Sequence, residues 1–245
     1  MPVEILNITP EFAREHQAAA DQAFLSDIKD TARNFEEHGI TGVANQWLLS
    51  MPWKRCLAFR LFADLLESDQ PQNRSVLEVG GSLSYFTYQL ATRHNYILLE
   101  SVTHEDQADY RHVENETGKS FLKIGDWADF EPETGHDVVI ANDVFPNVDQ
   151  RLYEFVDRFL PIAKELRLTL TYYEDTVFEV RRISSGEILT MKPWGLREMH
   201  HFVSHLATSY PQICGNLAVG DITYESYEGR LFSNRRNVVY LRITK

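Results

Sequence analysis

The sequence predicts an α/β fold with a largely parallel sheet that is preceded by helices. The main indication is the stretch from Ser75 to Glu100, where a strand pattern, a glycine turn, a helix pattern and a second strand pattern follow one another. Further strand and helix patterns alternate after this stretch, which is typical of sheets whose crossovers are helices. The 245 residues suffice for one large domain or for one domain with a cap.

The N-terminal part, residues 1–72, predicts a helical cap. Thr9-Pro10-Glu11 is typical of a helix start, because proline is favoured at the first helical position. Residues 57–66 carry apolar side chains at helical spacing, and the polar segment 68–73 separates them from the first strand of the sheet. We therefore expect a cap over residues 1–72 and the sheet domain over residues 73–245.

The segment Ser75–Glu100 has the pattern of a nucleotide-binding βαβ unit. Gly80 and Gly81 allow a ligand to approach the backbone, and the helix that follows offers free N–H groups at its N-terminus. Glu100 comes about 20 residues later, where an acid accepts the hydroxyl groups of a ribose. A pyrophosphate needs alternating glycines, but the next positions of that pattern are Ser82 and Ser84, so a dinucleotide is disfavoured.

Polar and aromatic residues follow the later strand patterns. Asp126 and Trp127 follow the strand at 120–124, and Asn142 and Asp143 follow the strand at 138–141. Ligands of open α/β sheets bind at such carboxyl ends. The alternative for Asp126 is a cap of the next turn, and the alternative for the Asn-Asp pair is a contact with the backbone of the helix at 149–163.

Tyr172 and Tyr173 end the strand at 166–172. Since successive side chains of a strand point to opposite faces, at most one of these tyrosines faces a ligand there. Two further strand patterns, at 222–227 and 237–243, close the chain.

The residues around the glycine turn resemble those of a known family. Val76-Leu77-Glu78-Val79-Gly80-Gly81 is similar to the first motif of class I S-adenosylmethionine-dependent methyltransferases, which reads apolar-apolar-acid-apolar-Gly-x-Gly-x-Gly. The likeness covers roughly residues 75–245 and departs from the motif at Ser82 and Ser84. It implies a Rossmann-like, seven-stranded, mostly parallel sheet with an antiparallel last strand, in which 222–227 and 237–243 form a closing hairpin.

The resemblance also implies the cofactor S-adenosyl-L-methionine and a set of site residues. Asp126 would accept a hydrogen bond from the adenine amino group, and Trp127 would lie against the ring. Aromatic side chains at a strand end suit a sulfonium ion, because the face of the ring attracts cations. The expected cofactor-binding residues are Glu78, Gly80, Gly81, Ser82, Glu100, Ser101, Asp126, Trp127 and Asn142, and the expected catalytic residues are Asn142, Asp143, Tyr172 and Tyr173.

Two other segments are candidates to cover the site in such a protein. One is the cap, with the lid candidates Asn45, Gln46, Trp47 and Trp53, although the tryptophans have the alternative role of anchoring helices. The other is a hairpin insertion at about 176–194, whose Arg181, Arg182, Lys192 and Trp194 would face a substrate carboxylate or, alternatively, solvent.

No metal site is expected. His201 and His205 are four residues apart in the helix predicted at 196–206, near His200, but the pattern supplies no third ligand. Cys56 and Cys214 lack metal-ligand spacing and suit a reducing cytoplasm, with both thiols in the core.

The composition limits the partners of the protein. Hydrophobic residues make up 43% of the chain, charged residues make up 24%, and the net charge is −12. An acidic surface disfavours nucleic acid, so we expect a small-molecule substrate. The sequence also shows neither an apolar run of ~18 residues nor an export signal, so no membrane association is expected. It does not predict an oligomeric state.

The expected activity is methyl transfer from S-adenosylmethionine to a small molecule, in the biosynthesis of specialised metabolites. A competing hypothesis is an enzyme that uses or cyclises the aminobutyryl arm of the same cofactor and releases methylthioadenosine. A binding protein without turnover and an NAD-type oxidoreductase are two further hypotheses. The nucleoside product distinguishes the two S-adenosylmethionine-consuming enzymes.

Overall fold

The computed structural model describes two compact units. Unit 1 contains Met1–Thr9 and Ala141–Lys245, and unit 2 contains Pro10–Ile140. The predicted division at residue 72, into a cap and a sheet domain, stays a prediction. The structure describes residues 2–40, 42–67, 72–100, 106–132, 135–146, 148–173, 178–181, 188–191, 194–223 and 236–245, and of 178–181 and 188–191 the backbone alone.

Seven strands of the described residues form one sheet in the order β1-β9-β6-β5-β2-β3-β4. β2 pairs parallel with β3, and β3 pairs parallel with β4. β9 runs antiparallel to both β6 and β1. The predicted Rossmann-like, mostly parallel sheet with an antiparallel last strand is therefore confirmed. The strands are β1 (Val3–Asn7), β2 (Ser75–Val79), β3 (Asn95–Glu100), β4 (Leu122–Ile124), β5 (His136–Asn142), β6 (Ala163–Tyr173) and β9 (Arg236–Thr244).

One strand of this sheet differs from the prediction. β1 lies in the segment that was expected to be helical, and it pairs with β9, with Val3 opposite Ile243 and Ile5 opposite Leu241. Ile222 and Thr223, the described part of the strand expected at 222–227, are not in a strand, and residues 224–227 lie outside the described residues. The alternation of Val3 and Ile5 is too short to identify a strand whose partner is at the opposite end of the chain.

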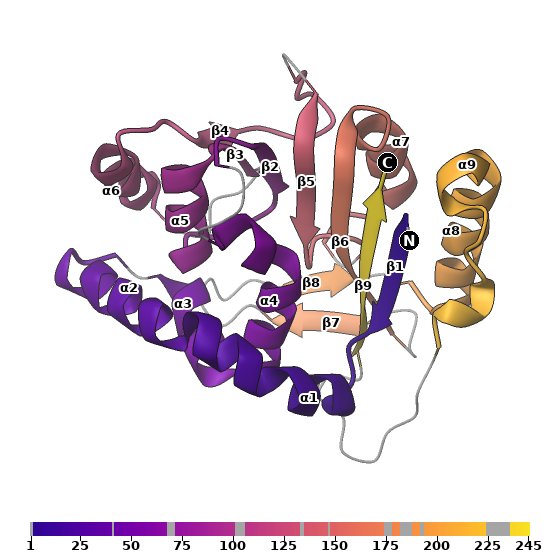
Figure 1. Cartoon of the computed structure of the whole chain (residues 1–245), viewed down its shortest axis with the longest axis horizontal. Helices are drawn as coiled ribbons and strands as arrows, with labels where there is room; N and C mark the ends of the chain where they lie inside the picture. Colours follow the sequence, from indigo (N-terminus) through magenta and orange to yellow (C-terminus); the bar gives the residue numbers. More distant parts are fainter. Residues whose placement is uncertain are drawn as a thin grey trace. The chain divides into compact units, whose positions relative to one another are not determined.

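The first helices of unit 2 form a continuous rod. α1 (Pro10–Ala20) begins at the predicted proline, and α2 (Ser26–Glu37) follows it through the π-helical turn η1 (Asp21–Leu25), whose flanking residues Ala20 and Ser26 keep helical backbone angles. Figure 1 shows this rod in indigo, with α1 and α2 in line. The other helices of this unit are α3 (Val43–Ser50), α4 (Pro52–Leu66), α5 (Tyr85–Arg93) and α6 (Gln107–Thr117).

An aromatic core joins these helices to the helix that follows the glycine turn. The ring of Phe86 in α5 packs edge-on against Phe24 of η1, at a centroid distance of 5.1 Å, and stacks on Phe62 of α4 at 4.7 Å. All three side chains are buried. Burial of aromatic rings is strongly stabilising, so this core fixes α4 and η1 against α5.

Unit 1 carries its own helices and a small second sheet. Its helical elements are α7 (Leu152–Phe159), α8 (Leu196–Ser209), α9 (Pro211–Cys214) and the short turn η2 (Val219–Asp221). Figure 1 shows α8 and α9 beside each other. β7 (Phe178–Arg181) and β8 (Ile188–Met191) pair antiparallel, as the predicted hairpin requires, while its turn lies outside the described residues.

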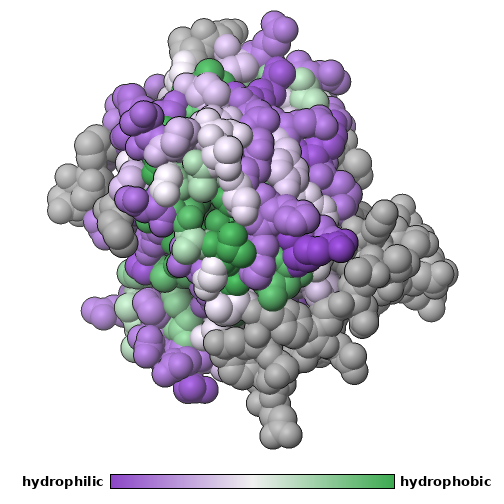
Figure 2. Space-filling view, turned by 90° about the vertical axis from the view of Figure 1, so that its right-hand side faces the viewer, coloured by the Kyte–Doolittle hydropathy of each residue, from purple (hydrophilic) through white to green (hydrophobic). Residues whose placement is uncertain are grey.

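One face of the molecule can be followed in a space-filling view. Figure 2 shows one face on which hydrophilic residues predominate and hydrophobic residues gather in one region. Of the described helices, none has the length and hydropathy needed to cross a membrane. The large hydrophobic side chains that the structure exposes are Trp47, Met51, Ile124, Val148 and Val219.

A buried arginine holds the N-terminal helices together. Arg55 of α4 donates from Nε to Asp21 Oδ1 at 2.7 Å, and from a terminal nitrogen to the carbonyl oxygens of Leu48 and Leu49. These carbonyls belong to the last turn of α3, where the helix itself supplies no donors. Arg55 therefore joins η1, α3 and α4 through hydrogen bonds.

We predict that Arg55→Ala lowers the free energy of unfolding by about 2–3 kcal/mol, because it removes the charged partner of the half-buried Asp21 carboxylate and the donor to two helix carbonyls. Arg33→Ala is the matched control, since Arg33 lies 3.5 Å from Asp30 with both side chains mostly exposed, and we expect a loss below about 0.5 kcal/mol. Urea unfolding followed by circular dichroism measures both values. Equal effects of the two substitutions would contradict the role of Arg55.

Candidate functional site

The glycine turn after β2 is fixed by two backbone requirements. Gly80 has φ +69, in the left-handed region that favours glycine, and its N–H donates to the carbonyl oxygen of Leu99 at 2.9 Å. At Gly81 a Cβ atom would lie 2.7 Å from the carboxyl group of Glu78 and 3.0 Å from Leu98. The backbone of the turn therefore passes directly against the buried Glu78 carboxyl group, and both predicted glycines are structurally required.

Glu78 is a buried acid beneath this turn. Its carboxylate accepts a hydrogen bond from the hydroxyl group of Tyr96 at 2.7 Å. Burial raises the pKa of Glu78 to about 7, the hydrogen bond from Tyr96 opposes this shift, and the nearby charge of Glu100 adds to it. Glu78 thus lies against the backbone of the turn at Gly81. Its contact with a cofactor stays a prediction.

The helix after the turn begins with its amide groups already bonded. Ser84 caps α5 by accepting from the N–H of Thr87, and the side chain of Thr87 in turn accepts from the N–H of Ser84. The N–H of Tyr85 donates to Asn45 Oδ1 at 2.9 Å. The expectation of free N–H groups is therefore wrong for Tyr85 and Thr87, because side chains of the protein take the place of an anion there.

Asn45 itself has an unused donor. Only 1% of the residue is exposed, and its Nδ2 has no hydrogen-bond partner among the described residues. A buried amide group without a partner is costly in free energy. Asn45 is therefore buried with one amide donor unused among the described residues, and its expected role as a lid residue stays a prediction.

Glu100 lies at the carboxyl end of β3, next to the glycine turn. It is 8% exposed, its carbonyl oxygen accepts from the N–H of Gly125, and Leu99 before it accepts from Gly80. The glycine turn, the end of β3 and the loop after β4 are thus joined by backbone hydrogen bonds. Ser82 lies in the same turn, where its carbonyl oxygen accepts from Thr87, while Ser101 lies outside the described residues.

The two residues expected at the adenine ring have other contacts in this structure. Asp126 Oδ1 accepts from the N–H of Ala128 at 2.9 Å, so it caps the turn at 127–129, which is the alternative that the sequence allowed. Trp127 is 5% exposed. Their contacts with adenine stay predictions.

In unit 1, Asn142 and Asp143 at the end of β5 are held by two threonines of β6. The hydroxyl group of Thr169 donates to Asn142 Oδ1 at 2.8 Å and accepts from the N–H of Asp143 at 2.7 Å. The hydroxyl group of Thr171 donates to Asp143 Oδ1 at 2.8 Å. Asp143 has φ +58, a conformation that aspartate tolerates more readily than most residues but that still costs free energy.

Arg236 completes this cluster. Its guanidinium lies 3.1 Å from Asp143 Oδ2 in an ion pair. Burial raises the pKa of Tyr173 to about 12, Arg236 opposes the shift, and the charge of Asp143 adds to it. We call Asn142, Asp143, Tyr173 and Arg236 the strand-end cluster.

Tyr172 does not belong to the strand-end cluster. Its hydroxyl group donates to the carbonyl oxygen of Thr223, and the residue is 1% exposed. The two tyrosines therefore have different environments, as alternation along the strand requires. The contact with Thr223 fixes the side chain of Tyr172 in unit 1, and the catalytic role expected of Tyr172 stays a prediction.

The remaining candidates have separate environments. Trp47 and Trp53 both lie near the ammonium group of Lys54, at 4.5 and 5.5 Å from the ring centroids. Trp194 packs against Tyr153 of α7 and Phe202 of α8. His200 contacts the carbonyl oxygen of Ile222, and His205 contacts Asp157. The side chains of Arg181, Arg182 and Lys192 lie outside the described residues.

Sequence reasoning did not identify Thr169, Thr171 and Arg236. The two threonines alternate with Leu168 and Leu170 in the second half of β6, and a buried hydroxyl group needs a hydrogen-bond partner. That requirement was a usable signal. No such signal pointed to Arg236, because it lies 93 residues from Asp143 along the chain.

Comparison with known proteins yields structural similarity alone. No protein-family model matches the sequence, and no curated protein matches it. The solved structures that resemble it include an S-adenosylmethionine-dependent methyltransferase from Clostridium acetobutylicum, with 11% identity, a TM-score of 0.43, and coverage of 77% of this chain and 89% of that one.

A second similar structure is the 1,6-didemethyltoxoflavin-N1-methyltransferase of Burkholderia thailandensis, with 11% identity, a TM-score of 0.46, and coverage of 77% and 78%. A third is the N-terminal domain of EvdMO1 with S-adenosylhomocysteine bound, with 14% identity, a TM-score of 0.46, and coverage of 77% and 80%. At this level of similarity these matches carry no argument about the site, which depends on the contacts described above.

We predict that Glu78 makes the stability of the protein fall as the pH rises from about 5 to 8. A folded-state pKa of about 7, raised from 4.5, means that the folded state binds the proton more tightly, so the stabilisation is present at low pH and is lost as the carboxyl group ionises. Glu78→Gln is neutral at every pH. Its stability relative to the unmodified protein should rise by about 2 kcal/mol between pH 5 and pH 8.

Urea unfolding at both pH values, with Glu131→Gln as an exposed control from the same unit, measures this difference. A stability difference between Glu78→Gln and the unmodified protein that stays constant with pH would show that Glu78 is ionised in the folded protein at pH 5.

Proposed function

We propose that this protein is an enzyme that binds S-adenosyl-L-methionine and transfers its methyl group to a small molecule. The observation that carries the proposal is the glycine turn of unit 2, with the buried acid Glu100 at the end of the neighbouring strand. This turn lies at the carboxyl end of β2. The order of the strands in the sheet reverses beside β2, and open α/β sheets bind ligands at such a reversal.

The residues of unit 2 suit an adenosyl cofactor. The carboxylate of Glu100 is a pair of acceptors for the two hydroxyl groups of a ribose. Gly81 keeps the turn free of a side chain, and Asn45 Nδ2 is a buried donor that lacks a partner among the described residues. We propose that Asn45 Nδ2 donates to an oxygen atom of the cofactor. The carboxylate of the cofactor is the chemically preferred acceptor, because hydrogen bonds to charged acceptors are stronger.

The same contacts disfavour a dinucleotide. A pyrophosphate binds to amide groups at the N-terminus of the helix after the turn. In this chain the N–H groups of Tyr85 and Thr87 are bonded to Asn45 and Ser84. S-adenosylmethionine has no phosphate group and does not need those donors, so a capped α5 favours it over NAD.

For the transfer step we propose a role of the strand-end cluster of unit 1. The cofactor supplies an electrophilic methyl group on a sulfonium ion; the acceptor forms a bond to that carbon as the carbon–sulfur bond breaks, and S-adenosylhomocysteine leaves. The protein has to align the acceptor and to exclude water. Asn142 and Asp143, held by Thr169 and Thr171, offer fixed oxygen atoms for this alignment.

The finer parts of the functional prediction are also proposals. They are specialised metabolism as the setting, the cytoplasm as the location, a lid that includes Asn45 and Trp47, and a substrate roof formed by the hairpin at about 176–194.

We predict that Glu100→Ala weakens the binding of S-adenosylhomocysteine by about 10–100-fold, because each hydrogen bond to a charged acceptor is worth about 1.5–3 kcal/mol. Calorimetric titration of the folded variant measures the dissociation constant, and Glu131→Ala, at an exposed position of the same unit, is the matched control. If Glu100→Ala and Glu131→Ala bind equally tightly, Glu100 is not part of the cofactor site.

We predict that turnover in the presence of an accepted substrate releases S-adenosylhomocysteine, since methyl transfer breaks the bond between the methyl carbon and sulfur. Chromatography of reactions with S-adenosylmethionine and a metabolite extract identifies the nucleoside. A reaction with enzyme and cofactor alone is the control. Steady formation of methylthioadenosine in that control would instead establish use of the aminobutyryl arm and overturn methyl transfer.

A further inference from the structure

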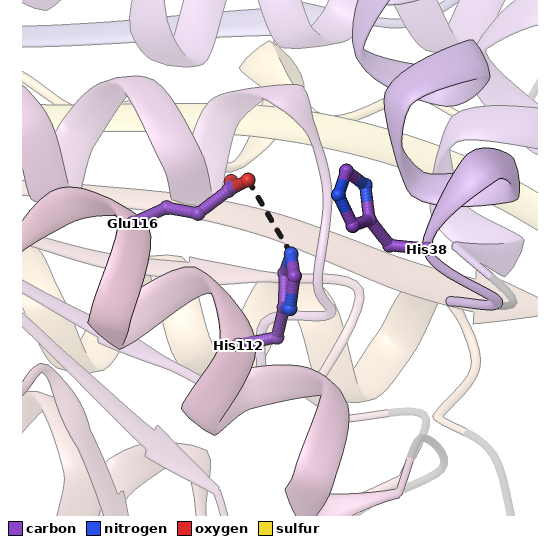
Figure 3. Close-up of side chains that lie close together, drawn as sticks. All are labelled: His38, His112 and Glu116. Atoms are coloured by element: carbon purple, nitrogen blue, oxygen red, sulfur yellow. Dashed lines mark ion pairs between the residues drawn. The ribbon is translucent and has the colours of Figure 1, made fainter.

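Two histidines and a glutamate lie together in unit 2, apart from the glycine turn in the sequence. His38 follows the last residue of α2, and His112 and Glu116 lie four residues apart on α6. One ligand atom of each residue lies within 4.8 Å of the others. Figure 3 shows both imidazole rings and the carboxylate turned toward the same space.

The hydrogen bonds of His38 determine which of its nitrogen atoms is free. Nδ1 lies 2.8 Å from the carbonyl oxygen of Asn34. A carbonyl oxygen only accepts, so Nδ1 carries the proton, and Nε2 of the neutral ring keeps its lone pair. Metal-binding histidines are commonly oriented by such a hydrogen bond from the second ring nitrogen.

His112 provides the second nitrogen atom. Its Nε2 lies 3.3 Å from Glu116 Oε1, yet this buried atom makes no hydrogen bond to any described residue. The His112 ring centroid lies 4.6 Å from that of His38. A positive charge placed among these groups would be stabilised by the carboxylate, by the lone pair of His38 Nε2 and, when Nδ1 of His112 carries the ring proton, by the lone pair of His112 Nε2.

We propose that His38, His112 and Glu116 bind a divalent transition-metal ion, with Zn²⁺ as the best match. Two imidazole nitrogens and one carboxylate oxygen are a common zinc ligand set, whereas Mg²⁺ and Ca²⁺ prefer oxygen atoms alone. The three residues leave the fourth tetrahedral position to water.

The spacing of the ligands is compatible with this proposal after a small adjustment. Bonds of about 2.0–2.1 Å to zinc place the ligand atoms of a tetrahedral site about 3.4 Å apart, compared with the limit of 4.8 Å here. His38 and Glu116 are exposed and His112 is half-buried, so rotation of the side chains can bring them closer without a change in the core.

The ion would connect the end of α2 to α6. His38 comes from the N-terminal helices, and His112 and Glu116 come from the helix between β3 and β4. A ligand that binds only the folded state stabilises it. The metal site would therefore act as a clip within unit 2, and it is independent of the proposed methyl transfer.

The test is a titration of the full chain, treated with a chelator and then dialysed, with Zn²⁺ and, for spectroscopy, with Co²⁺. We expect one equivalent of Zn²⁺ to bind at this site and to raise the melting temperature, with no comparable effect of Mg²⁺. His38→Ala, His112→Ala and Glu116→Gln should each weaken binding at least about 10-fold, as the loss of a ligand requires. Co²⁺ should produce visible absorption bands that the two histidine variants lack.

His205→Ala is the matched control, because His205 also lies near a carboxylate, 3.2 Å from Asp157, but in unit 1. It should bind Zn²⁺ as tightly as the unmodified protein. Circular dichroism without metal confirms that each variant is folded. Equal affinity in all variants, or the absence of saturable Zn²⁺ binding in the unmodified protein, would overturn the proposal and leave the ring contact of the two histidines and the His112–Glu116 contact as structural contacts.

Discussion

The close approach of the Gly80–Gly81 turn to the carboxyl group of Glu78 is the contact on which the rest of unit 2 depends. A side chain at residue 81 would come within 2.7 Å of that group, and Gly80 adopts a left-handed conformation to begin the turn. This path sets the start of α5, whose Phe86 anchors the N-terminal helices. It also brings the turn to the end of β3, where Glu100 lies. One steric requirement thus links the sheet, the helical layer and the proposed cofactor site.

The strand-end cluster of unit 1 follows a different principle. Asp143 adopts a left-handed conformation, and hydrogen bonds from Thr169 and Thr171 together with an ion pair to Arg236 fix its side chain and backbone. Strained residues that are held by several contacts occur often at functional sites. The strain supports Asp143 as a candidate site residue independently of any resemblance. The contacts of Thr169 and Thr171 explain how β6 helps to hold Asp143 in this conformation.

Local patterns predicted the central part of the fold, and long-range pairing limited the rest. The glycine turn, the flanking strands and the helix start at Pro10 follow from short-range rules of propensity and periodicity. β1 was missed because Val3 and Ile5 become a strand only by pairing with β9, at the other end of the chain. The role of Arg236 was not predicted for the same reason. The cap of α5 by Asn45 was also unpredictable, since 40 residues separate Asn45 from Tyr85 and no local pattern links them.

We propose that the glycine turn of unit 2 binds an adenosyl cofactor without a pyrophosphate. Side-by-side calorimetric titrations of the unmodified protein with S-adenosylhomocysteine and with NAD test it most directly. We expect saturable binding of S-adenosylhomocysteine with one site per chain, and no binding of NAD at the same concentrations. Binding of NAD as tight as that of S-adenosylhomocysteine, or no binding of S-adenosylhomocysteine to the folded protein, would contradict it.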